Sequence, residues 1–349
     1  MCALVFCAFT FCYLFFYQAD LLYVEQHMLS GGKTTYERTI GAVMITLLLQ
    51  LLQIAVAKLT KLGQGAHFLT YFPSLLVLTL LTNYAPGADG LFSFGRWPWI
   101  AVALVVVYVI VVAVVRPLSH INGRDGSRPL RYAWGNLLGM TVITAAAGLC
   151  GNGDALFHYR ARMERCIMQG DYDKALSVAP TTADAGLTMM RACALAERGL
   201  LGERLFEYPM TSTACAADLQ ESATYMLPRT TILETANRHA ADYRRCMCLI
   251  DGNLETFARL MLQDTLYNIM SDTTKVQMPV PKHYREALIL YTRTRTNPIV
   301  TYRDEVLDAD YEDFIRLLRS GGSETTRSDA LRSSYAGNYW YYYYLRTKN

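Results

Sequence analysis

Charged residues are scarce in the first 150 residues of this 349-residue chain, which hold 9 Lys or Arg and 5 Asp or Glu. The remaining residues hold 24 basic and 25 acidic side chains. This distribution excludes a single soluble globular enzyme, a disordered chain and a nucleic-acid-binding protein with a strongly basic face. We therefore expect two parts, an apolar one followed by a charged one.

The sequence also lacks the common catalytic and metal-binding motifs. It contains no phosphate-binding loop ending in Gly-Lys-Ser/Thr, no Gly-x-Ser-x-Gly, no His-Glu-x-x-His and no EF-hand loop. Nine cysteines are present, but no Cys-x-x-Cys pair occurs, and Cys246 and Cys248 would point to different faces of a helix. We predict no catalytic, cofactor-binding or metal-binding residue, although one or two structural disulfides are compatible with an exterior location.

Five windows in the first half are free of Asp, Glu, Lys and Arg, and each is long enough for a membrane-crossing helix of about 20 residues. The third contains Pro73, which predicts a kink. The first has no basic start and no Ala-x-Ala site at its end, so we expect an uncleaved span. The predicted transmembrane domain is residues 1–153, with spans at about 1–19, 39–57, 66–84, 97–115 and 133–151.

Lys and Arg in the short loops predict the orientation of these spans. Loops 58–61 and 116–131 would lie on the same side and hold six basic residues, against three on the other side, at Lys33, Arg38 and Arg96. This favours a cytoplasmic N-terminus and a periplasmic C-terminal domain. Counting Arg160, Arg162 and Arg165, which closely follow the last span, makes the balance even.

Helical patterns separated by glycines dominate the second half. Gly170, Gly199 and Gly252 each follow an amphipathic run and precede another, which predicts helix-turn-helix units with left-handed glycines. Further helices are expected at 281–294 and 309–318. We predict an all-α chain in which a helical-repeat domain at 154–320 follows the transmembrane bundle.

The string Gly170-Asp-Tyr-Asp-Lys-Ala-Leu176 resembles the turn of a tetratricopeptide repeat. The resemblance covers one turn and the start of one helix, and it implies stacked helix pairs. The turn glycines do not follow a strict period, so a generic helical bundle is the alternative.

Four strings, at 41–50, 69–75, 194–206 and 339–340, together resemble a family of uncharacterised multi-pass membrane proteins of Bacteroides-type bacteria, a domain of unknown function. The resemblance implies a location in the bacterial envelope. It implies no activity and no site residue.

Three groups of polar residues are candidates for sites. Asp20, Glu25 and His27 are interpreted as solvated charges at an interfacial helix end, because their spacing does not suit a proton relay. Gln50 and Gln53 share a helix face and are expected to join helices. The acidic cluster at 308–313 is interpreted as the N-terminus of a helix, where negative charge is favourable.

Residues 321–349 are predicted to be a linker and an aromatic C-terminal segment. Tyr335, Tyr339 and Tyr342 are spaced by four and three residues, which predicts one helix face that packs on the helical domain.

We expect a bacterial inner-membrane protein that presents a helical-repeat surface to a protein partner, without catalysis. The lipid bilayer and a protein are its expected partners, and nucleic acid is not. The alternative is a transporter or membrane enzyme with its site among the spans, which their lack of charged residues disfavours.

Overall fold

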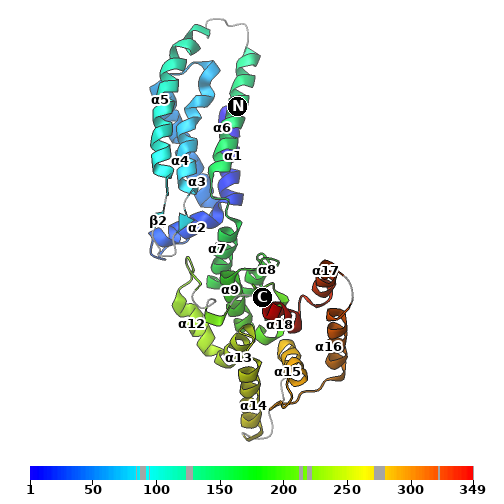
Figure 1. Cartoon of the computed structure of the whole chain (residues 1–349). Helices are drawn as coiled ribbons and strands as arrows, with labels where there is room; N and C mark the ends of the chain where they lie inside the picture. The colour runs from blue at the N-terminus through cyan, green and yellow to red at the C-terminus, as the bar shows by residue number, and fades with distance from the viewer. Residues whose placement is uncertain are drawn as a thin grey trace. The chain divides into compact units, whose positions relative to one another are not determined.

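The computed structural model describes residues 1–83, 85–86, 92–93, 95–122, 129–211, 215–217, 222–270, 280–320 and 323–348. The described chain is helical apart from one pair of two-residue strands. It divides into two compact units, Met1–Ala161 and Arg162–Asn349, and helix α7 runs across the boundary (Figure 1). The predicted helical class is therefore confirmed.

The first unit is a bundle in which α1 contacts α3 and α6, and α4 contacts α3, α5 and α6 (Figure 1). Its elements are α1 (Cys2–Cys12), the π-helix η1 (Tyr13–Tyr17), α2 (Ala19–Leu29), α3 (Arg38–Thr60), the 3₁₀-helix η2 (Gln64–Tyr71), α4 (Phe72–Thr82), β1 (Ala85–Pro86), β2 (Phe92–Ser93), α5 (Trp97–Asn122), α6 (Pro129–Cys150) and α7 (Ala155–Met168).

Four helical segments among the described residues are long and apolar enough to cross a membrane: Arg38–Thr60, Gln64–Thr82, Trp97–Pro117 and Arg131–Cys150. The first predicted span differs from the expected straight helix. It bends by 74° between Cys2–Tyr17 and Ala19–Leu29, and it counts as a fifth segment only if this pair is one broken span. A π-helical turn precedes the bend, and such turns interrupt the regular i to i−4 bonding of a helix.

The predicted third span is interrupted before Pro73. A 3₁₀ segment with a non-helical residue at Ala66 precedes α4, and Pro73 lies in the first turn of α4. A proline is tolerated there because the backbone N–H of a first-turn residue has no partner within the helix. The break is therefore upstream of the proline and is bridged by Asn136, whose Oδ1 accepts from the Phe68 N–H at 2.9 Å and whose Nδ2 donates to the Gln64 carbonyl at 2.7 Å.

The second unit consists of helices that surround an aromatic core. Its elements are α8 (Tyr172–Ser177), α9 (Ala185–Glu197), α10 (Leu201–Arg204), the 3₁₀-helix η3 (Leu205–Glu207), α12 (Arg229–Arg238), α13 (Ala240–Ile250), α14 (Leu254–Met270), α15 (Lys282–Thr294), α16 (Glu305–Leu318), α17 (Glu324–Tyr335) and α18 (Tyr339–Lys348).

The three predicted glycine turns share one geometry. Gly170, Gly199 and Gly252 have φ values of 72°, 68° and 70°. In each turn the glycine N–H bonds to a carbonyl three residues earlier, and the next N–H bonds to a carbonyl five residues earlier. This pair of bonds is the Schellman motif, which satisfies carbonyls at the end of a helix. The helices that follow differ in length, since α8 has 6 residues, α10 has 4 and α14 has 17.

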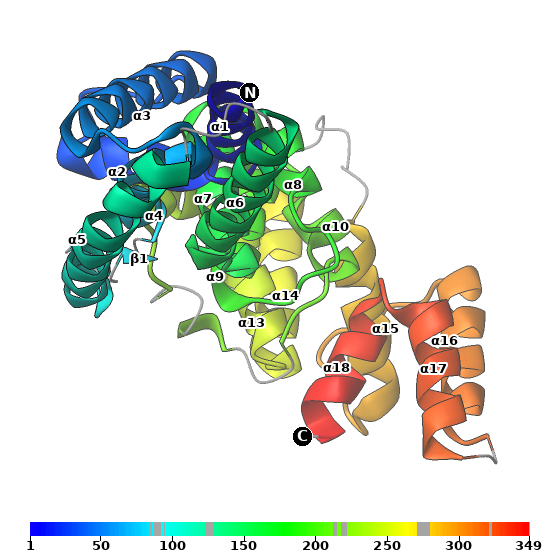
Figure 2. The same ribbon diagram turned by 90° about the horizontal axis from the view of Figure 1, so that it is seen from above.

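The aromatic C-terminal segment is part of the core of the second unit. Tyr339 and Trp340 are almost fully buried, and the Trp340 indole N–H donates to the Glu286 carbonyl at 2.8 Å. Figure 2 shows α18 beside α15, which it contacts. The expectation of one continuous helix was wrong, because Tyr335 ends α17 and a turn at Ala336–Asn338 separates it from α18.

Candidate functional site

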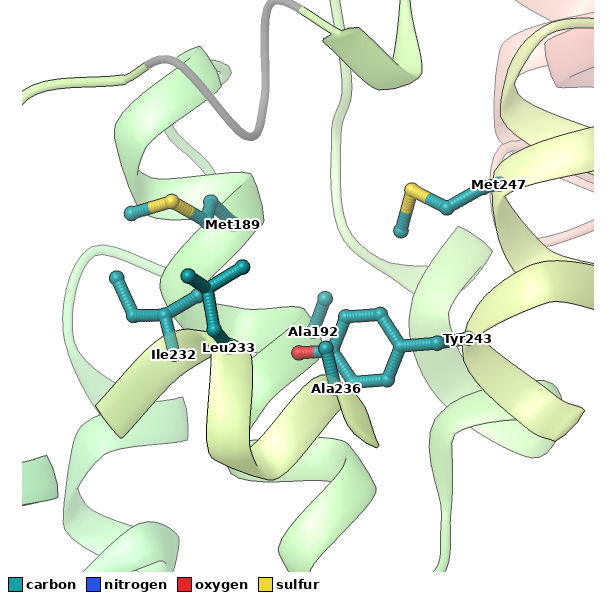
Figure 3. Close-up of a pocket in the computed structure, with 7 residues that line it drawn as sticks. All are labelled: Met189, Ala192, Ile232, Leu233, Ala236, Tyr243 and Met247. Carbon is teal, nitrogen blue, oxygen red and sulfur yellow. The ribbon is translucent and has the colours of Figure 1, made fainter. Parts of the chain in front are cut away.

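A small pocket lies between α9, α12 and α13 of the second unit (Figure 3). Its volume is about 40 Å³ and its mouth is partly open. The lining residues are Met189 and Ala192 of α9, Ile232, Leu233 and Ala236 of α12, and Tyr243 and Met247 of α13. Almost all of this lining is apolar, and methionine supplies a flexible side chain on each of two walls.

Local interactions determine where the three helices of the pocket begin. Asp184 caps α9, since its side chain accepts from the Leu187 N–H at 2.9 Å. Pro228 precedes α12, and His239 interrupts the helical path so that α13 starts in a new direction. The short chain between α12 and α13 keeps these two helices adjacent, which places Ala236 and Tyr243 in the same pocket.

Two side chains of α12 fix it against α9. Thr235 donates its hydroxyl to Glu197 at 2.8 Å, and Arg238 forms an ion pair with the same carboxylate at 2.6 Å. Arg238 is largely exposed, so the ion pair contributes little, about 0–1 kcal/mol, whereas Thr235 is buried and its bond orients the helix. These contacts hold the pocket walls without entering the pocket.

The segment that leads into α12 is held by a buried carboxylate on α7. Glu164 accepts hydrogen bonds from three consecutive backbone N–H groups, those of Tyr225, Met226 and Leu227, at 2.6 to 3.0 Å. Charge-assisted bonds to backbone N–H groups are strong. The start of α12 is therefore positioned by a residue about sixty positions away in the sequence.

Tyr243 is the one polar residue that lines the pocket. Its side chain reaches across from α13, and its hydroxyl lies beside Ala192 and Ala236 (Figure 3). The residue is only 8% exposed, and its hydroxyl has no hydrogen-bond partner among the residues that the structure describes. Burial raises the pKa of this phenol above its usual value, so it remains a hydrogen-bond donor at neutral pH.

An unsatisfied buried hydroxyl costs about 1–3 kcal/mol of stability. Because this oxygen is itself buried, the pocket presents an apolar surface to a ligand. Leu233 is 57% exposed at the rim. Arg229 and Arg244 are exposed and flank the pocket on α12 and α13 by helical register. The site can therefore accept a small aliphatic group.

A second cluster of polar groups lies in the first unit, where the N-terminal helix bends. Gln18 is 3% exposed, and its Nε2 donates to the Tyr13 hydroxyl and to the Asn152 carbonyl, each at 3.1 Å. Tyr13 in turn lies 3.4 Å from the Thr82 hydroxyl. Because the amide nitrogen must face a carbonyl, Gln18 Oε1 points elsewhere, and it accepts no bond from any described residue.

Glycine is required next to this cluster. A Cβ atom on Gly151 would lie 1.7 Å from the Tyr13 hydroxyl, so any side chain there would displace the ring. The cluster joins the end of η1, the end of α4 and the segment after α6. It leaves one orphan acceptor, Gln18 Oε1, at a helix break. In transporters, discontinuous helices are where substrate and ion sites form.

The structure places the polar residues that the sequence singled out in different environments. Asp20 is buried in α2, which differs from the solvated position expected for it. Gln53 donates to Thr70 at 2.9 Å, so this residue joins α3 to η2. All nine cysteines are in the described part of the chain and carry free thiols.

The acidic cluster at 308–313 lies in α16, whose first residue is Glu305 rather than the expected 309. Asp304 caps this helix by accepting from the Val306 and Leu307 N–H groups, each at 3.2 Å. Asp308 pairs with Arg293 at 2.8 Å. No group of three or more metal-ligating side chains occurs within the described ranges.

Sequence reasoning did not identify Tyr243 or Gln18 as site residues. Tyr243 lies on the apolar side of α13 with Met247, and this pattern is also that of an ordinary core tyrosine. Gln18 lies at the end of the first predicted span, and no local pattern marks it. Each residue is marked by a buried polar atom that has no hydrogen-bond partner among the described residues. This feature can be recognised only once the positions of the surrounding helices are known.

Comparison with known protein families gives a match in the second half of the chain. Residues 216–346 match the model of a family described as a family of unknown function, DUF6057. The matched segment contains α12 and α13 but not α9, and it ends within α18, so it includes the aromatic segment. No curated protein and no solved structure matches the chain. The C-terminal part of this chain is thus similar to a family of unknown function.

Proposed function

We propose that this chain is a membrane-held protein-interaction module of the bacterial envelope. The pocket between α9, α12 and α13 carries the proposal, because it is partly open and its lining is apolar, with a flexible methionine on each of two walls. A volume of about 40 Å³ is small beside the ~150 Å³ of a cavity that binds benzene. The expected occupant is therefore the side chain of a partner protein rather than a lipid tail or a cofactor.

The helix pairs that end in Schellman turns support a repeat-like architecture of the tetratricopeptide kind, in which stacked pairs present a binding surface. The apolar helices would hold this surface at the inner membrane. The distribution of Lys and Arg among the loops supports a periplasmic second unit.

The experiment is purification of the full chain in mild detergent with a pocket-filling variant. Ala236→Trp places a large side chain in the pocket, and Ala241→Trp places the same side chain at an exposed position on α13 as the matched control. A stoichiometric protein partner should accompany the parent and the Ala241→Trp chain and be lost from Ala236→Trp. If pocket filling changes no interaction of the protein, the proposal is wrong.

The orphan acceptor of Gln18 favours a second candidate function, a transporter or membrane enzyme with its site at the helix break. A cation bound there would stabilise the folded chain by mass action. Sodium or potassium chloride should then raise the melting temperature relative to choline chloride at equal ionic strength. Gln18→Met, which keeps the shape without the amide, should abolish that difference. Equal melting in all three salts would remove this candidate.

A further inference from the structure

Helix α3 begins with an arginine whose guanidinium is held against two aromatic rings. The central carbon of the Arg38 guanidinium lies 4.1 Å from the centre of the Phe15 ring and 5.7 Å from that of the Phe16 ring. Arg38 Nε also donates a hydrogen bond to the Phe15 carbonyl. Both aromatic residues belong to the π-helical turn η1. Because a ring face attracts a cation, this turn fixes the position of the guanidinium.

The outer edge of this guanidinium remains available to a ligand. Arg38 is exposed, and its Nη1 and Nη2 atoms have no hydrogen bond or ion pair within the part of the chain that the structure describes. The neighbouring carboxylate of Glu37 is engaged elsewhere, since it accepts from the Ile40 N–H at 2.6 Å and caps α3. The Nη donors therefore form a planar fork of fixed orientation, which matches the oxygens of a phosphate group.

Arg38 lies at the edge of an apolar surface. The segment Arg38–Thr60 is long and apolar enough to cross a membrane, and it begins at this residue. In a membrane the guanidinium would therefore lie at the level of the lipid headgroups. Next to it, Phe16 and Tyr17 are 60% and 72% exposed, and tyrosine is enriched at this level of membrane proteins.

An apolar strip of three side chains leads from the arginine along the first helix. Leu4, Phe11 and Phe15 are spaced by seven and four residues, so they share one face. Phe11 stacks on Phe15 with ring centroids 5.4 Å apart, and Leu4 is 74% exposed. A ligand whose phosphate binds Arg38 can therefore lay a hydrocarbon chain along this strip.

We propose that Arg38 binds the phosphate of an anionic phospholipid whose acyl chain lies along the strip of Leu4, Phe11 and Phe15. No described carboxylate pairs with Arg38, so a headgroup with a net negative charge is favoured over a zwitterionic one. The site belongs to the first unit, whereas the pocket belongs to the second. This inference is therefore independent of the proposed protein-interaction function.

The experiment is native mass spectrometry of the full chain in mild detergent, titrated with phosphatidylglycerol and, separately, with phosphatidylcholine. The parent should bind one phosphatidylglycerol more tightly than any phosphatidylcholine. Arg38→Gln should weaken this first binding step about tenfold, because it removes a charged forked donor. Arg96→Gln is the matched control, since it removes the same charge on the same predicted side of the membrane, from an exposed arginine that no described ring holds. It should bind phosphatidylglycerol like the parent.

Two further measurements separate lipid binding from folding and from binding of free phosphate. Arg38→Lys keeps the positive charge but not the planar fork, so its binding of phosphatidylglycerol should weaken several-fold. Its melting temperature in lipid-free detergent should stay close to the parental value, because the residue is exposed. Added phosphatidylglycerol should raise the melting temperature of the parent by mass action, whereas the same concentration of sodium phosphate should not.

Equal binding of phosphatidylglycerol by the parent and by Arg38→Gln overturns the inference. An equal loss in Arg38→Gln and Arg96→Gln also overturns it, because attraction by overall charge would then explain the binding. Parental affinity in Arg38→Lys has the same consequence, since a point charge would be sufficient. If sodium phosphate stabilises the parent as well as phosphatidylglycerol does, the acyl-chain contact is wrong and the site is not a lipid site.

Discussion

Replacing Gly170 or Gly199 with alanine should destabilise the second unit through backbone strain alone. Both residues have positive φ values, which cost an L-residue about 1–2 kcal/mol. An added methyl group would meet no described atom within 4 Å at either position, so no steric clash contributes. Alanine also restricts the unfolded chain, which offsets part of the cost and leaves a net loss of about 1 kcal/mol.

A loss of about 1 kcal/mol corresponds to a decrease of about 2–4 °C in melting temperature for a unit of this size. Trp340 is the single tryptophan of the second unit and is 1% exposed, so its emission shifts to the red on unfolding. The assay is thermal unfolding of the full chain in detergent, followed at Trp340 after the other three tryptophans are replaced with phenylalanine. The double variant should lose about twice as much, since the two turns are separate.

The matched control is Gly337→Ala, also in the second unit, because a methyl group added to Gly337 would make only ordinary contact with Glu207 at 3.8 Å, while its φ is not in the left-handed region. It should melt like the parent. If the melting temperatures of Gly170→Ala and Gly199→Ala fall no further than that of Gly337→Ala, the two turns are not held in the left-handed conformation, and the argument from the Schellman motif fails.

Further predictions concern the thiols, the aromatic segment and the topology. Cys246 is buried and its pKa is raised to about 12 by burial, so at pH 8 a thiol reagent should label it at least ~100-fold more slowly than the partly exposed Cys248. The folded state holds the Cys246 proton more tightly than the unfolded chain, in which the thiol has a pKa near 9. The stabilisation from this group should therefore decline as pH rises from about 9 to 12, and the free energy of unfolding in denaturant measures it. Tyr342→Phe removes the donor to the Ile250 carbonyl and should cost about 1–2 kcal/mol in the same melting assay, whereas Tyr341→Phe should cost nothing. A reporter active only outside the cytoplasm should be active when fused after residue 349 and silent at residue 123, and the reverse pattern would refute the orientation but not the helix assignment.

Local chemistry explains which elements could be predicted from the sequence. A glycine after an amphipathic run marks a helix end because only glycine adopts the left-handed conformation without cost, and all three such turns were predicted correctly. Pro281 likewise marked the start of α15. Long uncharged runs identified the apolar helices for the same reason, since hydropathy is a property of the residues themselves.

Features that depend on distant contacts were not predictable. The bend at Gln18 follows a π-helical turn and is held by two long-range contacts, Tyr13 with Thr82 over 69 positions and Gln18 with Asn152 over 134, and no local motif marks it. The pocket requires α9 to meet α12 and α13, and the residue that positions α12 is Glu164 on α7. The pocket therefore depends on tertiary packing, which cannot be predicted from the periodicity of a single helix.

The burial of α18 has a consequence for how the protein is made. Phe206 packs against Tyr342, with ring centroids 5.1 Å apart, and 136 positions separate the two residues in the sequence. At about 5–20 residues per second, the ribosome needs roughly 7–27 s to synthesise the chain between them. During that interval the apolar helices of the first unit are already available for insertion. The aromatic residues around Phe206 stay exposed, because α18, which packs against them, has not yet been synthesised. We expect a chaperone, or the translocation machinery itself, to protect that face until α18 emerges.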